Sequence, residues 1–169
     1  MEDMLRIFDE YLKSKDLNIV RGLTVAIELE MKSRYYYQAK SDDMRSQIGK
    51  MLLNFLANEE LTHLNILENV KRNLEANNKW IETREISRRE MAKPRLFEGK
   101  QTEPRIDSTS ADKDILLAAM SAERRSEEYY LRMSEKVRDA KGKSLFEALA
   151  KFERRHYETI RGFLDGSGQ

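Results

Sequence analysis

The stretches Ala26-Ile27-Glu28-Leu29-Glu30 and Glu60-Leu61-Thr62-His63 decide the fold of this chain, because both recur 93 positions later. The later copies read Ala119-Met120-Ser121-Ala122-Glu123 and Glu153-Arg154-Arg155-His156. In each copy a lone glutamate precedes a Glu-x-x-His motif by 30 residues, and the two histidines of the chain lie in these motifs. Matched spacing of this kind indicates an internal duplication built around residue types that bind metals.

The duplication also distinguishes between adjacent glutamates that one copy leaves open. Position 28 corresponds to a serine in the second copy, whereas Glu30 corresponds to a glutamate. Glu59 corresponds to Phe152, whereas Glu60 again corresponds to a glutamate. Glu30 and Glu60 are therefore the expected functional members of their pairs. Other residues repeat in the same register: Tyr36 with Tyr129, Tyr37 with Tyr130, Leu52 with Leu145, Leu56 with Leu149, and Gly49-Lys50 with Gly142-Lys143.

Length and composition favour a single helical domain over residues 1–169. Charged residues make up 36% of the chain, and there are only 7 glycines and 2 prolines, a composition that suits long helices with solvated outer faces. A net charge of +1 argues against nucleic acid as the main partner. The absence of cysteine excludes disulfides and thiolate metal sites. With no signal peptide at the N-terminus and no long apolar run, we expect no membrane association and a cytoplasmic location.

Hydrophobic spacing and turn residues predict the helices. A short amphipathic helix is expected over residues 2–13, and longer helices over about 17–42, 46–76, 110–139 and 144–164. Residues that meet in an antiparallel hairpin lie about equally far from its turn, so the first turn is expected at 41–46 and the second at 139–142. Ser46 is a candidate cap for the helix that follows the first turn. Ser144-Leu145-Phe146-Glu147 has the pattern of a capping box for the helix after the second.

Residues 77–110 break the helical pattern and contain both prolines, Pro94 and Pro104. A connection of this length is usually functional or a crossover. The predicted fold is all-α: a four-helix bundle made of two antiparallel helical hairpins, about 17–76 and 111–164, joined by one long crossover and preceded by the short helix. Trp80 and a basic group in the connection, Arg88-Arg89 with Lys93 and Arg95, are expected to be solvated.

The spacing of the motifs predicts a two-metal site. Glutamate and histidine three residues apart project from one face of a helix, so each motif offers two ligands, and each lone glutamate adds one. Two such sets facing inward match the carboxylate bundles that bind two iron or two manganese ions. Four carboxylates balance two divalent cations, and iron, manganese or zinc suits these donors. The predicted ligands are Glu30, Glu60, His63, Glu123, Glu153 and His156.

Each motif also has a simpler interpretation. A single Glu-x-x-His on a helix is most often a surface accident, but two copies in register with two further glutamates make that interpretation a poor one. Tyr37 and Tyr130 lie two turns from the lone glutamates on the same helix face. They either pack in the core or donate hydrogen bonds that orient a ligand carboxylate.

At these residues the chain resembles the rubrerythrin-like branch of the ferritin-like superfamily, over about residues 17–164. The resemblance implies a ferritin-like bundle with two iron ions held by the six predicted ligands. Rubrerythrin proper carries a cysteine-rich rubredoxin domain, which a chain without cysteine lacks. It also has a further glutamate one turn after the ligand of its third helix, where this chain has Ser126. The more symmetric set here is similar to the ferroxidase centre of bacterioferritin.

Three functions are consistent with this pattern. The leading hypothesis is an oxidoreductase of oxidative-stress defence that reduces peroxide or dioxygen at two irons, with electrons from a separate donor protein. The alternatives are a ferroxidase for iron storage or detoxification, and a structural bundle stabilised by its metal. We also expect a homodimer, because five apolar residues outside the bundle need cover from their own bundle or a second subunit. These residues are Leu5, Phe8, Leu12, Trp80 and Ile81.

Overall fold

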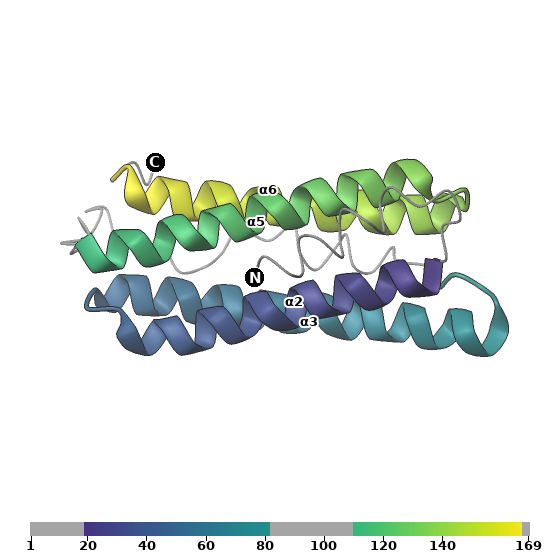
Figure 1. Ribbon diagram of the computed structural model, residues 1–169, viewed down its shortest axis with the longest axis horizontal. Helices are drawn as coiled ribbons and strands as arrows, with labels where there is room; N and C mark the ends of the chain where they lie inside the picture. The colour runs from purple at the N-terminus through teal and green to yellow at the C-terminus, as the bar shows by residue number, and fades with distance from the viewer. Residues whose placement is uncertain (1–18, 82–109, 167–169) are drawn as a thin grey trace, which may run out of the picture.

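The computed structural model describes residues 19–81 and 110–166 and shows four long helices in them (Figure 1). They are α2 (Ile19–Asp43), α3 (Gln47–Asn77), α5 (Ser110–Lys136) and α6 (Ala140–Leu164). The described ranges contain no strand, which confirms the all-α four-helix bundle. The predicted helix over 2–13 and most of the predicted crossover lie outside the described residues. No helix in the described ranges has the length and apolar character of a membrane span.

The helices form two antiparallel hairpins packed side by side. Within each hairpin, α2 packs closely on α3 and α5 packs closely on α6. Between the hairpins, α2 lies against α5 and α3 lies against α6. Figure 1 shows α3 ending at the opposite end of the bundle from the start of α5. The chain between Ile81 and Ser110 therefore joins opposite ends of the bundle, as a crossover does.

Capping residues determine where the hairpins turn. Ser46 caps α3, and its hydroxyl accepts a hydrogen bond from the Gly49 backbone N–H at 3.2 Å. Asn78 ends α3 in the left-handed region, with φ of 52°. The predicted capping box at Ser144 is wrong, because α6 already begins at Ala140. Its cap is Asp139, whose carboxylate accepts hydrogen bonds from the backbone N–H groups of residues 141 and 142 at 2.8 and 3.3 Å.

Close packing at the turns explains two of the repeated residues. A Cβ added at Gly49 would lie 2.1 Å from the Met44 side chain, and one added at Gly142 would lie 2.5 Å from the Trp80 ring. The tight packing favours glycine most strongly at position 142, where the Trp80 ring and Val137 would both have to move, whereas at position 49 the end of the flexible Met44 side chain could shift. Trp80 is half-buried against the core, together with Ile81, so the expectation that Trp80 is solvated is wrong. Its ring covers the start of α6 in its own bundle.

The buried apolar residues form two clusters, one toward each end of the bundle. One cluster includes Leu23, Leu67, Tyr129, Phe146 and Leu149. The other includes Tyr37, Leu52, Leu56, Leu116 and Ile160. The lone glutamates and the Glu-x-x-His motifs occupy intermediate positions along each helix, so a buried polar layer lies between the two clusters. This layer is the candidate functional site.

Candidate metal centre

All six predicted ligands are buried in this layer. Their side chains are 2% exposed or less, although four of them are glutamates. Burying four carboxylates together is costly unless cations or protons compensate the charge. The structure groups the residues into two overlapping sets that could each hold a metal ion: Glu30, Glu60, His63 and Glu153, and Glu60, Glu123, Glu153 and His156.

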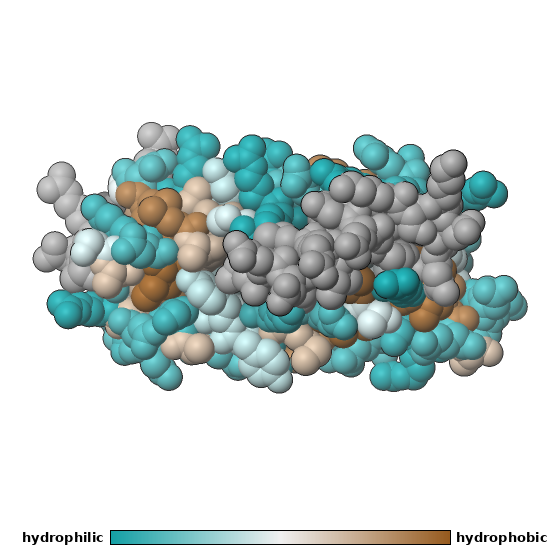
Figure 2. Space-filling model, in the orientation of Figure 1, coloured by the Kyte–Doolittle hydropathy of each residue, from teal (hydrophilic) through white to brown (hydrophobic). Residues whose placement is uncertain are grey.

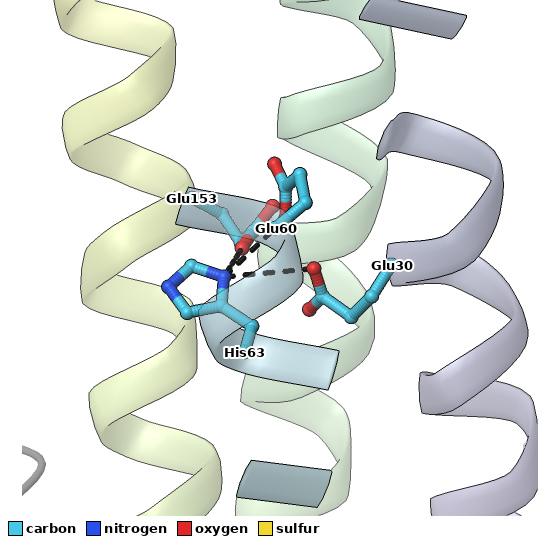
Figure 3. Close-up of side chains that lie close together, drawn as sticks. All are labelled: Glu30, Glu60, His63 and Glu153. Atoms are coloured by element: carbon cyan, nitrogen blue, oxygen red, sulfur yellow. Dashed lines mark ion pairs between the residues drawn. The ribbon is translucent and has the colours of Figure 1, made fainter. Parts of the chain in front are cut away.

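The first set surrounds the imidazole of His63 (Figure 3). The Nδ1 atom of His63 lies 3.3 Å from a carboxylate oxygen of Glu60 on the same helix. It lies 3.5 Å from an oxygen of Glu30 on α2 and 3.5 Å from an oxygen of Glu153 on α6. Three helices therefore direct their donor atoms to one point.

The second set surrounds His156 in the corresponding way. The Nδ1 atom of His156 lies 3.4 Å from Glu60 Oε1 and 3.4 Å from Glu123 Oε2. Glu60 and Glu153 belong to both sets, and each of them comes from a different hairpin. Glu60 directs one oxygen toward His63 and the other toward His156, so its carboxylate could contribute to both sets.

The spacing of the donor atoms suits binding of a metal ion better than it suits hydrogen bonds among the donors. In the described part of the chain, both oxygens of Glu60 and both ring nitrogens of His156 accept or donate no hydrogen bond. Glu123 Oε2 and Glu153 Oε1 are in the same position. Two ligands of one metal ion, each about 2.1 Å from it, are separated by roughly 3.0–3.4 Å. The observed nitrogen–oxygen distances of 3.3–3.5 Å are close to that range.

The electrostatics of the cluster without cations point the same way. Burial, and then repulsion from the other carboxylates, raises the pKa of both Glu60 and Glu153 well above the usual value. Burial also acts to raise the pKa of Glu30, but the neighbouring Glu60 and His63 outweigh it and lower that pKa to about 2. Both shifts arise because carboxylates are packed together in a buried layer, and a cation bound among them would oppose the shifts.

Tyr37 and Tyr130 support the lone glutamates across the two hairpins. The Tyr37 hydroxyl on α2 donates to Glu123 on α5, and the Tyr130 hydroxyl on α5 donates to Glu30 on α2. Burial and the adjacent glutamate raise the pKa of both tyrosines well above the usual value, so both remain protonated donors. Both interpretations of these tyrosines are therefore true, because they are packed in the core and also orient carboxylates.

A second pair of tyrosines, not assigned a role from the sequence, joins the same two helices. Tyr36 donates to the backbone carbonyl of Ile115 at 3.0 Å, and Tyr129 donates to that of Gly22 at 2.6 Å. Positions 22 and 115, like 36 and 129, differ by 93. Four tyrosine hydrogen bonds therefore link α2 and α5, and each bond has a counterpart in the other direction. In the sequence, the repeat of the Tyr-Tyr pair at the same offset is the feature that could have indicated these contacts.

Three further residues lie beside the ligands on the α3–α6 side. The Phe152 ring stacks on His63 with centroids 5.1 Å apart. The Arg155 guanidinium lies 5.2 Å from the centre of the Phe152 ring and forms an ion pair with Glu59 at 3.2 Å. The sequence showed that Glu59 and Phe152 differ between the copies, but it did not indicate that Phe152 stacks on a candidate ligand or that Glu59 pairs with the arginine over that ring.

This bundle and its paired carboxylate–histidine sets define a ferritin-like protein with a candidate two-metal centre. A family model for rubrerythrin matches residues 22–164, so the chain belongs to the rubrerythrin family. A solved structure, a hypothetical protein from Pyrococcus furiosus, is 25% identical to it, with a TM-score of 0.61. The match covers 90% of this chain and 94% of that one. No curated protein matches the chain.

Proposed function

We propose that the chain holds two iron ions between its hairpins and uses them to reduce hydrogen peroxide or dioxygen. The observation that carries this proposal is the sharing of Glu60 and Glu153 by two buried sets of donors. Shared carboxylates keep two metal ions close enough to act on one small molecule. Carboxylate and imidazole donors suit iron among other metals, and membership of the rubrerythrin family supports iron as the choice.

The residues of the chain contribute charge, orientation and exclusion of water. Two bound Fe(II) ions supply the two electrons that, with two protons, reduce hydrogen peroxide to two water molecules or dioxygen to peroxide. Four carboxylates balance the charge of such a pair. Tyr37 and Tyr130 fix the oxygens of Glu123 and Glu30 that they contact, leaving the other oxygen of each free to bind. The apolar clusters on both sides keep bulk water away from the layer.

The electrons would come from a separate donor protein. The chain contains no cysteine and therefore no rubredoxin-type iron site of its own.

We also propose a homodimer in the cytoplasm. Since Trp80 and Ile81 pack on their own bundle, a dimer interface would depend on other apolar residues, and Leu5, Phe8 and Leu12 lie outside the described residues. Light scattering tests the dimer, because a mass near that of one chain would exclude it.

Metal analysis of protein purified without added metal tests the proposed centre. We expect close to two irons per chain. The reduced protein should then be reoxidised rapidly by a stoichiometric amount of peroxide, as followed by its absorbance. Bound metal that peroxide does not oxidise would favour the structural role instead. Protein that binds no metal under any loading condition would contradict the proposal.

A ferroxidase is the second candidate, and the residue that favours it is Ser126. This serine is buried one turn after Glu123, at the position where rubrerythrin has a further glutamate, so the set of donors is nearly symmetric. A ferroxidase would oxidise added Fe(II) with dioxygen through many turnovers and retain the ferric product. Ferric iron accumulating far beyond two per chain, in an assembly much larger than a dimer, would move this function to first place.

A further inference from the structure

We propose that the ion pair between Glu59 and Arg155 is the gate through which divalent metal ions enter and leave the centre. The proposal rests on the metal centre described above and adds a route to it. Glu59 precedes the shared ligand Glu60 in the chain, and Arg155 precedes His156. The Arg155 guanidinium lies over the Phe152 ring, which itself stacks on the candidate ligand His63, so the ion pair belongs to the layer that covers this ligand.

The centre needs a gate because its donors are closed to solvent. All six candidate ligands are 2% exposed or less, so a metal ion cannot reach them without displacing a side chain. The α2–α5 side is poorly suited to opening. Four tyrosine hydroxyls cross that seam, and those of Tyr37 and Tyr130 end on the glutamates themselves.

The α3–α6 side is closed by a weaker device. α3 and α6 approach each other less closely than the helices within either hairpin do. The Glu59–Arg155 pair bridges these two helices at 3.2 Å, and the two side chains are 25% and 28% exposed. A partly exposed ion pair has a small net stability, so thermal motion can break it. Long side chains at a helix surface can move without disturbing the backbone.

The difference between the repeats selects which half of the centre opens. Phe152 stacks on His63 and covers that imidazole with an apolar ring. At the corresponding position in the first hairpin the chain has Glu59, a carboxylate that can attract a cation. When Arg155 releases it, this carboxylate is free to bind an incoming ion one residue away from Glu60. The Arg155 guanidinium also lies over the Phe152 ring, so its release should open the half of the centre that contains His63.

Metal release from the full-length protein loaded with Co(II) tests the gate. The absorbance of bound Co(II) is followed after excess EDTA is added, so no redox activity is required. Glu59→Gln breaks the ion pair at nearly constant side-chain volume, and Arg155→Gln breaks it with a shorter, uncharged side chain. We expect both to release Co(II) roughly 1.5-fold to fivefold faster than the parent protein at unchanged stoichiometry. Arg155→Lys keeps the charge and should restore slow release.

Arg154→Gln is the matched control. Arg154 is the neighbouring residue and pairs with Glu127 at 2.8 Å, but that pair lies within the α5–α6 hairpin and its arginine is 60% exposed. This variant should release Co(II) at the parent rate. Release from Arg155→Gln and Glu59→Gln at the rate of the Arg154→Gln control would overturn the gate. That result would leave the proposed metal centre intact, whereas failure of every form to bind Co(II) would overturn both.

Discussion

The two hairpins carry the same candidate ligands at corresponding positions but differ in some of the residues around those ligands. α2–α3 and α5–α6 carry the same ligands, the same pair of tyrosines and the same glycine at the start of the second helix. Even the caps Ser46 and Asp139 occupy corresponding positions. Among the positions that differ are Glu59 and Phe152: Phe152 stacks on His63, and Glu59 pairs with Arg155. The duplication has therefore kept the groups that face the centre and varied those that separate it from solvent.

The strongest test of equivalence between the hairpins removes the shared glutamates one at a time. Glu60→Ala and Glu153→Ala each take a carboxylate from both sets of donors, so we expect neither variant to hold two metal ions or to turn over peroxide. Metal analysis and peroxide-driven reoxidation measure both properties. Without metal, each variant should be at least as stable as the parent, because one carboxylate leaves a repelling cluster. A variant that keeps two metals and full turnover would remove that residue from the site.

Removal of the metal should make the stability of the chain depend on pH through the buried glutamates of both hairpins. In the metal-free chain, the raised pKa values of Glu60 and Glu153 let the folded state hold protons that the unfolded state has lost. The folded state then binds more protons, so the free energy of unfolding falls as the pH rises above about 4.5. Glu30, with its pKa lowered to about 2, acts oppositely, but only below the usual glutamate value of 4.5.

Urea unfolding at about pH 5 and about pH 7, with and without Co(II), measures this effect. The metal-free chain should be less stable at the higher pH. The loaded chain should show the reverse trend, because metal ions bind the ionised carboxylates. A metal-free chain that gains stability between these two pH values would show that protons do not occupy the layer.

The reciprocal tyrosines provide a smaller test of symmetry. Tyr37→Phe and Tyr130→Phe each remove one hydrogen bond to a ligand carboxylate, and loss of such a supporting contact weakens metal affinity by roughly 10- to 100-fold. Competition with a chelator should give similar losses for the two variants. Tyr36→Phe is the control, since its hydroxyl donates to a backbone carbonyl and its loss should lower stability but not affinity. Unequal losses would show that the two halves are oriented differently.

The smallest expected effect is a difference in stability between variants that lack the cap at one turn or the other. Asp139→Ala removes the cap of α6 and should cost about 1 kcal/mol of stability in urea unfolding. Ser46→Ala should cost less, because Asp112 on α5 also accepts hydrogen bonds from the backbone N–H groups of Arg45 and Ser46 at 3.0 and 3.3 Å. A larger loss from Ser46→Ala would mean that Asp112 does not hold the first turn.

The sequence predicted the bundle and the residues of its polar layer because both depend on periodicity. The offset of 93 residues identified Glu30 and Glu60 within adjacent pairs, and the structure brings both into the buried layer. The turn at Ser46 followed from the requirement that ligands in a hairpin lie equally far from it. The helix α6 begins before the capping pattern at Ser144, and its actual cap, Asp139, is the residue that corresponds to Ser46 in the repeat.

Contacts between the two hairpins could not be predicted from the sequence. A helix position shows that Tyr37 lies on the same face as Glu30, but its hydroxyl reaches Glu123 because α2 and α5 lie side by side. Neither the stacking of Phe152 on His63 nor the Arg155 ion pair follows from spacing along one helix. These contacts depend on the distance and rotation between helices of different hairpins, which apolar periodicity does not specify.

The tyrosine contacts have the pattern of an isologous interface, in which residue i of one copy meets j of the other and j meets i. Tyr36 reaches residue 115 and Tyr129 reaches residue 22, as two identical hairpins related by a two-fold axis would. If the hairpins were separate molecules, assembly of the centre would depend on their concentration. A covalent connection makes the association of the hairpins intramolecular, so it no longer depends on the concentration of the protein. One chain can then complete its metal centre at any dilution.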